Sequence, residues 1–365
     1  MKASIIVSID ANPVLVENYI CNLDKYPTIT DYDVVFTNDG GHETAISKLL
    51  VEKNFNHKYQ YIPNESKQGY GVVNNNAVKY ALSDTLIFMN SDVILNSRCL
   101  EIMLSELESP DVDAVQPLLI YPQTGLVQST GHVFSKNYNT HLFENRRTED
   151  DIVQIKGERQ SFTTALCCMR RDVFNAYGGF DSFYFNAWEG MELGLRIHHD
   201  GGRILYTPEA RAYHIRGGGR GIYSIDERPQ SAEFWSRWRE KIVPDIYNYL
   251  KMQLDKINLL SSEYILLNFS SIRDISHITD HLDLDISKTI YFTEYSGLSN
   301  IEFFKTIPYY WIVIKRPLII FANNFTSIKN NYYWLESRGN KYDLAMDLSG
   351  NCDLCSSFYH NLGSK

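Results

Sequence analysis

The N-terminal part of the chain alternates between apolar runs and segments with helical spacing, and this alternation constrains the fold more than any other feature. Continuous runs rich in β-branched residues are typical of strands buried on both faces of a sheet. Strands that alternate with helices predict a mostly parallel sheet covered on both faces. The predicted strands are Ser4–Ile9, Asp33–Gly41, Lys58–Pro63 and Thr85–Val93, and the predicted helices are Pro13–Leu23, Thr44–Lys53 and Gly71–Leu82.

Polar residues follow the ends of three of these predicted strands. Asp10 ends the first strand, the pair Asn38–Asp39 ends the second, and Asn90–Asp92 ends the fourth. Ligands of open α/β sheets bind at the carboxyl ends of the strands, so we expect a binding site at this edge. For Asp10, capping of the next helix is an equally good interpretation.

The pattern is less regular in the middle of the chain. Phe134–Gln154 is polar and irregular, which favours a loop region over the site, and Arg216–Arg220 is a glycine-rich segment that we expect to be a flexible loop. The other expected elements are a strand at Ala114–Tyr121, a strand entering a short helix in Ser161–Asp181, a helix at Trp188–Asp200, and a strand pair or one bent strand at Arg203–His214.

The composition changes near residue 226, and a chain of 365 residues suits two domains. We expect an α/β domain at 1–225, which carries the predicted binding site, and a smaller α/β appendage at 226–365. Phe234–Ile257 is expected to form one long amphipathic helix. The aromatic and basic residues at its start suit either a contact with an acceptor or membrane surface, or a helix that packs its Trp face on the catalytic domain, which we favour. The appendage has three candidate roles: homo-oligomerisation, acceptor binding or membrane docking.

The net charge of −9 disfavours nucleic acid as a partner, and no basic block marks a nucleic-acid surface. No run of about 20 apolar residues exists, so no membrane span is expected. Six Cys without an export signal favour reduced thiols and a cytoplasmic location, with peripheral contact at the inner face of the membrane as an option. Cys352 and Cys355 form one CxxC, for which two buried thiols are a simpler interpretation than zinc or redox chemistry.

The strongest single motif is Asn90-Ser91-Asp92 at the end of the fourth predicted strand. Hard divalent cations bind oxygen ligands, usually one or two carboxylates together with substrate phosphates. Asp92 is therefore a candidate ligand of Mn²⁺ or Mg²⁺, with Asn90 close by. A turn-forming Asn/Asp pair after a strand is the alternative interpretation.

Three blocks together resemble the family 2 glycosyltransferases, which have the GT-A fold, and in particular their rhamnosyltransferase-like members. Gln68-Gly69-Tyr70-Gly71 and Asn74-Asn75 fit the glycine-containing stretch of that family, and Asn90-Ser91-Asp92 fits its metal motif. Thr163–His214 is similar to the acceptor-side block, which ends in Tyr-His. The resemblance covers roughly residues 3–220 and not the C-terminal appendage.

The resemblance implies a set of functional residues. Asp92 would bind the metal, and His214 would add a metal or diphosphate contact. For His214, a surface or core histidine without a ligand role is an equally good interpretation. Asn38 and Asp39 match the turn that contacts the nucleobase, although the family usually has Asp where this chain has Asn38. The remaining implied donor-binding residues are Asp10, Gly69, Tyr70, Asn74, Asn90 and Ser91.

The chain departs from the family at the expected catalytic base. The family usually has Glu-Asp at the start of an acidic helix, and its Asp is the base, but this chain has Glu189-Gly190-Met191-Glu192. Glu189 is the first candidate for the base and Glu192 the second. Carboxylates that satisfy the helix dipole are the alternative interpretation.

The sequence thus predicts an inverting, metal-dependent glycosyltransferase of bacterial type. It would move a sugar from a UDP or dTDP donor to a glycan or lipid-linked glycan acceptor, in surface polysaccharide or glycoprotein glycan synthesis. One alternative is a catalytically silent nucleotide-sugar-binding module of a larger synthase complex, because Gly190 replaces the expected base. The other is a nucleotidyltransferase, which normally needs a glycine-rich, basic loop after the first strand. Asp10-Ala11-Asn12-Pro13 does not supply such a loop.

Overall fold

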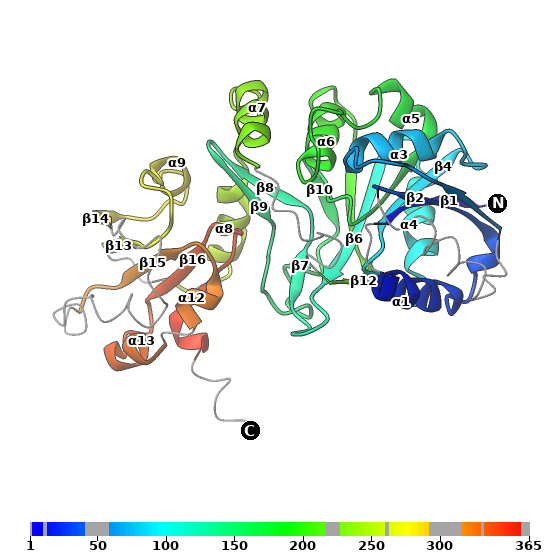
Figure 1. Cartoon of the computed structure of the whole chain (residues 1–365). Helices are drawn as coiled ribbons and strands as arrows, with labels where there is room; N and C mark the ends of the chain where they lie inside the picture. Colours follow the sequence, from blue (N-terminus) through cyan, green and yellow to red (C-terminus); the bar gives the residue numbers. More distant parts are fainter. Residues whose placement is uncertain are drawn as a thin grey trace. The chain divides into compact units, whose positions relative to one another are not determined.

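The computed structural model describes residues 2–9, 13–40, 58–215, 227–259, 263–291, 315–329 and 332–358. The chain forms two compact units (Figure 1). Unit 1 contains Met1–His132 and Arg147–Lys241, and unit 2 contains Val133–Arg146 and Ile242–Lys365. The predicted helix Thr44–Lys53, the predicted loop Arg216–Arg220 and the candidate residue Asp10 lie outside the described residues.

Unit 1 is built on a mixed sheet whose first strands are parallel, as the sequence predicts. Along the sheet the strands follow the order β10-β12-β6-β11-β4-β1-β2-β3, with β5 paired to β12 and β7 paired to β6. β1 pairs in parallel with both β2 and β4, and β2 pairs in parallel with β3. The strands are β1 Ala3–Ile9, β2 Tyr32–Asn38, β3 Tyr59–Ile62, β4 Thr85–Asn90, β5 Val93–Leu95, β6 Ala114–Ile120, β7 Val127–Ser129, β10 Gly157–Arg159, β11 Leu166–Arg170 and β12 Ile204–His214.

Helices cover both faces of this sheet (Figure 1). Successive side chains of a strand point to opposite faces, so Ile5 and Val7 of β1 join the core under α1 and α4, whereas Ile6 joins the core under α3, α5 and α6. The helices are α1 Pro13–Asp24, α3 Tyr70–Val78, α4 Cys99–Leu107, α5 Arg171–Ala176, α6 Glu189–His199 and α7 Arg228–Trp238, with a 3-10 turn at Ile29–Asp31.

β12 is one bent strand, which decides between the two interpretations of Arg203–His214. It pairs with β6 along its length, but the register shifts between Thr207 and Arg211, around Pro208. Proline lacks the N–H that a ladder needs, so it suits such an irregularity. Beyond the bend, β12 pairs with β5, and His214 lies opposite Val93. The bend therefore brings His214 beside the turn that follows β4.

The expectation of an irregular loop at Phe134–Gln154 is wrong for its first part. β8 (His132–Ser135) and β9 (Tyr138–His141) pair with each other as a two-stranded sheet. Within unit 2, the Phe134 backbone N–H donates to Asp245 Oδ1 at 2.8 Å. Because the β9 sequence Tyr-Asn-Thr-His has no apolar alternation, periodicity did not reveal this hairpin.

The single long helix expected at Phe234–Ile257 is also wrong. The segment contains the end of α7 and a second helix, α8 (Ile246–Leu254). Pro244 lies between them, and proline ends a helix because it lacks an N–H and restricts the residue before it. Phe234 and Trp238 of α7 are 0% and 6% exposed, in agreement with the packing interpretation of this aromatic segment.

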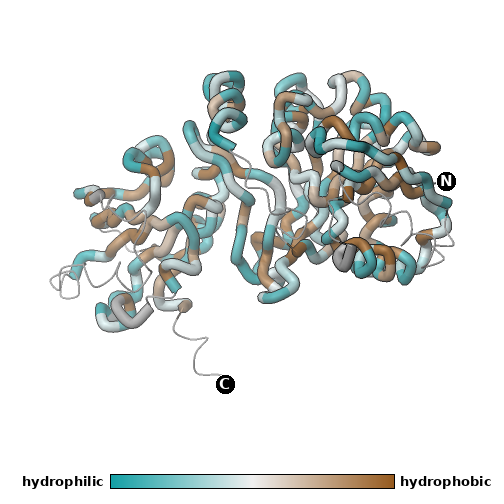
Figure 2. The backbone as a smooth tube through the Cα atoms, viewed as in Figure 1, coloured by the Kyte–Doolittle hydropathy of each residue, from teal (hydrophilic) through white to brown (hydrophobic). Residues whose placement is uncertain are grey.

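Unit 2 is a smaller α/β unit, which confirms the expected class of the appendage. Its sheet has the order β14-β13-β15-β16-β17, and only β17 is antiparallel to its neighbour. Figure 2 shows apolar strands inside both units. The elements are β13 Tyr264–Asn268, α9 Ser276–Thr279, β14 Ile286–Tyr291, β15 Leu318–Ala322, α12 Phe325–Lys329, α13 Tyr332–Arg338, β16 Leu344–Asp347, β17 Cys352–Leu354 and a 3-10 turn at Cys355–Phe358.

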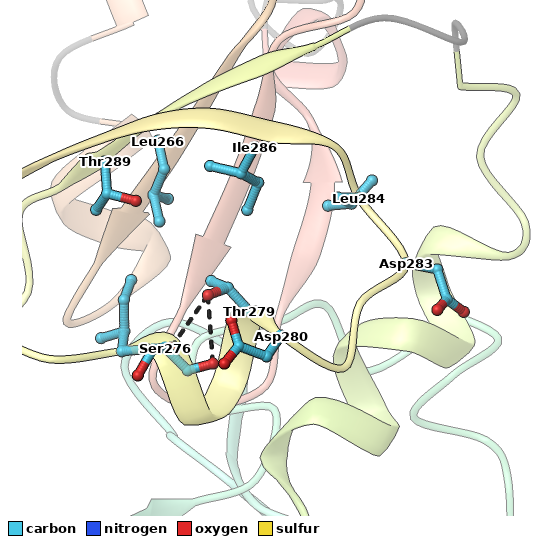
Figure 3. A pocket seen from close by; sticks show the side chains of 9 residues that line it. Leu266, Ser276, Thr279, Asp280, Asp283, Leu284, Ile286 and Thr289 are labelled. Carbon is cyan, nitrogen blue, oxygen red and sulfur yellow. Dashed lines mark hydrogen bonds between the residues drawn. The ribbon is translucent and has the colours of Figure 1, made fainter.

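Unit 2 also contains an open pocket of about 460 Å³ between α9 and the strands β13 and β14 (Figure 3). The hydroxyl of Thr279, which lines the pocket, donates to the carbonyls of Ile275 and Ser276, so its hydrogen-bond donor is already used by the nearby backbone. Asp283 at the rim forms an ion pair with Lys251 at 2.6 Å. None of the predicted site residues lines this pocket.

The structure also bears on the expectations for the CxxC pair and for membrane-spanning segments. Cys352 and Cys355 are buried, free thiols, and no group of three or more His, Cys, Asp or Glu among the described residues is arranged to hold a metal. Across the same described part of the chain, the helices are too short or too polar to pass through a bilayer.

Candidate active site

The parallel register brings the predicted polar residues to one edge of the unit 1 sheet. Ser8 of β1 lies opposite Asn90 of β4, and Ile9 lies opposite Asn38 of β2. Both asparagines therefore end their strands on either side of β1. The turn Ser91–Asp92 follows directly, and both side chains are nearly buried, with 6% and 7% of each residue exposed.

Asp92 and His214 form a close pair at this edge. Asp92 Oδ1 lies 3.1 Å from His214 Nε2, and the Asn90 amide nitrogen lies 3.4 Å from the same ring nitrogen. The backbone supports the pair, because the Ile215 N–H donates to the Asp92 carbonyl at 3.1 Å. Two distant parts of the sequence thus present a carboxylate oxygen and an imidazole nitrogen to the same point.

The spacing of these two atoms fits a divalent cation. Two ligands at right angles around a cation, each roughly 2.1 Å away, are about 3 Å apart. Carboxylate oxygen and imidazole nitrogen are both ligands of Mn²⁺ and related ions. Asp92 and His214 could therefore act as neighbouring ligands of one ion, and Asn90 is placed to contribute an amide oxygen after rotation of its side chain.

Gln128 of β7 holds the other side of the His214 ring. Its Oε1 lies 2.6 Å from His214 Nδ1, and its Nε2 donates to the His214 carbonyl at 3.0 Å. Only 2% of Gln128 is exposed. The imidazole is thus fixed by one amide on one edge and faces Asp92 with the other.

Asp39 organises the glycine-containing loop before α3. Its Oδ1 accepts the backbone N–H groups of Gln68 at 2.7 Å and Gly69 at 2.9 Å. Gly69 has a φ of +91°, and a Cβ there would lie 2.4 Å from the Phe185 carbonyl oxygen. A side chain is excluded at this position, so glycine is required for the close approach of the loop before α3 to the loop that contains Phe185.

Three other predicted donor-site residues are engaged inside the protein. The Asn38 side chain, 0% exposed, accepts the Asn64 N–H at 2.6 Å and donates to the Asn64 carbonyl at 3.2 Å. Burial raises the pKa of Tyr70 well above its ordinary value, so its hydroxyl stays protonated and donates to the Thr164 carbonyl at 3.2 Å. Asn74 is buried and donates to the Tyr70 carbonyl, while its Oδ1 has no hydrogen-bond partner.

The two candidate bases lie on the first turn of α6 but have different surroundings. Glu192 Oε2 lies 2.8 Å from Arg196 Nε and 2.7 Å from Arg196 Nη2. Arg196 also donates to the carbonyls of Tyr177 and Gly179, which ties Glu192 to the loop after α5. Glu189 begins the helix and accepts the Trp188 N–H at 3.1 Å. Each glutamate is 3% exposed.

The position of the missing aspartate is occupied by a neighbour. A Cβ on Gly190 would lie 2.4 Å from Thr164 Cγ2, and a Cβ on Gly194, one turn later, would lie 2.3 Å from Ser161 Oγ. Ser161 Oγ in turn donates to the Met191 carbonyl at 2.9 Å. The two glycines let α6 approach the segment 161–164 closely. Gly190 is therefore part of how this helix packs, and Thr164 fills the space of a side chain there.

Helix α7 holds the loop that leads into α6. Gln230 Oε1 accepts the N–H groups of Phe185 at 2.8 Å and Asn186 at 3.3 Å. The Phe185 carbonyl accepts the Tyr70 N–H at 2.9 Å, so the loop before α6 and the start of α3 are bonded together. Arg237 pairs with Asp181 at 2.5 Å, and this bond raises the pKa of the guanidinium.

The sequence patterns do not mark Gln128, Thr164, Arg196 or Gln230 as residues of the site. Gln128 and Gln230 are buried polar residues in short elements, and periodicity does not mark such positions. The i,i+4 spacing of Glu192 and Arg196 on a predicted helix is a signal that could have identified their ion pair.

Comparison with known proteins identifies the family of the chain. The model of a family described as glycosyltransferase like family 2 matches residues 5–235, which is more than half of the chain. The chain belongs to this family. The family suggested by the sequence motifs is thereby confirmed.

This family 2 glycosyltransferase is similar to two groups of proteins, each represented by one relative. The O-antigen biosynthesis protein RfbC of Myxococcus xanthus is 27% identical over 250 residues, which are 64% of this chain and 18% of that protein. Polypeptide N-acetylgalactosaminyltransferase 11 of Xenopus tropicalis is 24% identical over 207 residues, which are 53% of this chain and 34% of that protein. The chain spans less than half the length of both relatives.

The fold agrees as well. A crystal structure of GalNAc-T7 with UDP, GalNAc and Mn²⁺ superposes with a TM-score of 0.52 at 14% identity, over 68% of this chain and 50% of that one. The predicted GT-A class of the family 2 glycosyltransferase is confirmed by this likeness. The individual site residues and the metal remain predictions.

Proposed function

We propose that this protein transfers a sugar from a nucleoside diphosphate to a glycan or lipid-linked glycan, with inversion at the anomeric carbon and with Mn²⁺ or Mg²⁺. Membership of family 2 supports sugar transfer. The relative named as an O-antigen biosynthesis protein supports a role in surface polysaccharide synthesis. The observation that carries the metal-dependent part is the 3.1 Å separation of Asp92 Oδ1 and His214 Nε2.

At the donor end, Asp92 and His214 would hold the cation, with Asn90 beside them. A bound divalent cation neutralises the charge that develops on a departing diphosphate. Two protein ligands leave coordination positions for diphosphate oxygens and water. Asp39 would keep the loop at Gly69 in the shape that lets backbone approach the donor, since its Oδ1 binds two N–H groups of that loop.

At the acceptor end, Glu189 is the better candidate for the base. Direct displacement at the anomeric carbon needs one group that takes the proton of the acceptor hydroxyl. Glu192 is committed to Arg196 through one of its oxygens, and this pair holds the loop after α5. Glu189 lies at the start of α6, next to the loop that Tyr70 and Gln230 hold.

The test is turnover of a panel of UDP-, dTDP- and GDP-sugars with Mn²⁺, followed as release of the nucleoside diphosphate. We expect one or a few donors to be hydrolysed slowly, and Asp92→Ala to lower this rate by about 10³-fold or more. Chelation of the cation should have the same effect. With an acceptor, NMR of the product should show inverted configuration, and retained configuration would contradict the one-base mechanism.

A second candidate is a nucleotide-sugar-binding module without catalysis, and the close contact at Gly190 favours it. In that case calorimetry with Mn²⁺ would detect binding of a nucleoside diphosphate sugar, but no donor in the panel would turn over. Loss of this binding in Asp92→Ala would still assign the site, whereas wild-type binding in that variant would exclude a metal role for Asp92.

A further inference from the structure

We infer that Gln128 is a positioning residue that fixes the ring proton of His214 on Nδ1 and makes Nε2 the nitrogen that binds the cation. This inference rests on the proposed metal site and names a residue that controls it. Gln128 touches neither the donor nor the reacting atoms in our proposal, and acts through His214.

The direction of the Gln128 amide follows from its two partners. The His214 carbonyl can only accept, so the group 3.0 Å away must be the amide NH₂ of Gln128. The opposite orientation would place two carbonyl oxygens in contact. Oε1 must then face His214 Nδ1, at 2.6 Å. Because an amide oxygen cannot donate, the proton of this bond belongs to Nδ1.

The consequence appears on the other edge of the ring. In neutral His214 with its proton on Nδ1, Nε2 carries a lone pair that points at Asp92 Oδ1, 3.1 Å away. Two acceptors at this distance repel each other unless a cation or a proton lies between them. A metal-binding histidine usually donates its other N–H to a polar group, which sets the orientation of the ring.

Gln128 is held in place by the sheet and not only by His214. Its strand β7 pairs with β6, where Val127 lies opposite Ile120 and Ser129 opposite Leu119. β6 also pairs with β12, and Ile120 lies opposite Tyr213. Three adjacent strands therefore fix the amide relative to the imidazole, and Gln128 is 2% exposed.

Gln116 of β6 provides a matched control in the same region. It is fully buried, its Oε1 accepts the Thr163 N–H at 2.9 Å, and its Nε2 donates to Ser129 Oγ at 3.3 Å. It bonds no imidazole. Gln116→Leu and Gln128→Leu thus remove the same groups from neighbouring buried strands, but only the second releases the His214 ring.

The experiment measures Mn²⁺ affinity by electron paramagnetic resonance in the presence of UDP, with the full chain and the variants Gln128→Leu, Gln128→Glu, Gln116→Leu and Asp92→Asn. Loss of a group that orients a ligand typically weakens metal binding by about 10–100-fold, which we expect for Gln128→Leu. Gln128→Glu keeps an oxygen that accepts from Nδ1–H but loses the NH₂ that donates to the His214 carbonyl, so its affinity should fall by less than that of Gln128→Leu. Gln116→Leu should bind Mn²⁺ as the wild type does.

Two results would overturn the inference: wild-type affinity in a folded Gln128→Leu protein, or equal weakening in Gln128→Leu and Gln116→Leu. Asp92→Asn separates this from failure of the proposed function, because unchanged binding in that variant would mean that no cation binds at Asp92 at all. Should Gln128→Leu fail to fold, ¹⁵N–¹H NMR of the wild-type protein can show which ring nitrogen of His214 carries the proton. A proton on Nδ1 supports the inference, and a proton on Nε2 alone contradicts it.

Discussion

The two units place carboxylates at the ends of buried strands in opposite electrostatic situations. In unit 2, Asp347 ends β16 and is fully buried. Its two oxygens accept the N–H groups of Phe325, Ser349 and Asn351 and the Asn351 amide, at 2.8 to 3.0 Å. In unit 1, Asp92 follows β4, and its Oδ1 faces the ring nitrogen of His214. One carboxylate accepts four hydrogen bonds from the protein, and the other has beside its Oδ1 a ring nitrogen that is itself a possible metal ligand.

This difference separates a structural carboxylate from a candidate ligand more clearly than the motif does. Asp347 ends β16 and Asp92 follows β4, so both lie at the carboxyl end of a strand that has a parallel neighbour, and sequence pattern alone treats them alike. Buried polar groups need partners, and a group whose partners all come from the protein has no need of a ligand. The following predictions test whether this distinction holds.

The largest expected effect concerns the two glutamates of α6, of which Glu192 forms an ion pair with Arg196 and Glu189 is the proposed base. Glu189→Gln should lower kcat of donor turnover by about 10²–10⁴-fold, since loss of a general base typically costs this much. Glu192→Gln should lower kcat by less than about tenfold and reduce the free energy of unfolding by roughly 1–3 kcal/mol, because it weakens the buried ion pair with Arg196. Steady-state kinetics and urea unfolding measure both.

Glu189→Asp serves as the control for this pair, since it keeps a carboxylate but shortens it. Part of the activity should return relative to Glu189→Gln. If instead Glu192→Gln proves the more severe change in kcat while its unfolding curve matches the wild type, Glu192 is the base and the distinction fails within unit 1.

An intermediate effect is expected on stability when the saturated carboxylate is removed. Asp347→Ala leaves four buried donors without an acceptor and should lower the free energy of unfolding of unit 2 by about 3 kcal/mol. Asp92→Ala removes one of two opposed groups and should change the stability of unit 1 by less than about 1 kcal/mol. Urea unfolding followed by Trp fluorescence and by far-UV circular dichroism reports both units.

The distinction between Asp347 and Asp92 is wrong if Asp92→Ala loses more stability than Asp347→Ala. A large loss of stability in Asp92→Ala would mean that Asp92 is a structural partner of His214. Asp347→Asn is the milder control, because the amide keeps one acceptor oxygen of the same size, and it should fall between Asp347→Ala and the wild type.

Sequence patterns predict the sheet of unit 1 and the edge where the candidate residues lie, because both follow from short-range features. Apolar runs marked β1, β2, β3 and β4, and parallel pairing then brought Asn38 and Asn90 together. The hairpin β8–β9 and the break at Pro244 were missed for different reasons. The β9 strand of the hairpin has no apolar alternation, and helical spacing continues on both sides of Pro244 although proline ends helices.

The partners of the site residues could not be predicted, because they come from distant parts of the chain. Gln128 and His214 are 86 positions apart, and Asp39 and Gly69 are 30 positions apart. Such bonds depend on the register of the sheet and on loop geometry, which one sequence does not specify. The amide of Asn38 illustrates the same point, since its bond to Asn64 was not expected from its place at a strand end.

The smallest effect is expected from restoring the aspartate at position 190. A Cβ there would lie 2.4 Å from Thr164 Cγ2, so Gly190→Asp should cost roughly 1–3 kcal/mol of stability through overpacking. Thr164→Ala removes that methyl group, so the double variant Gly190→Asp/Thr164→Ala should regain about 1 kcal/mol relative to Gly190→Asp alone. Urea unfolding of the four proteins of this cycle gives the coupling. Additive effects would show that Thr164 does not occupy the place of the missing side chain.

The same double change in a Glu189→Gln background tests which residue acts as the base. Recovery of turnover would place the base at residue 190, where the resemblance to the family 2 glycosyltransferases predicts it. A protein that folds but stays inactive would leave Glu189 as the carboxylate that this site uses.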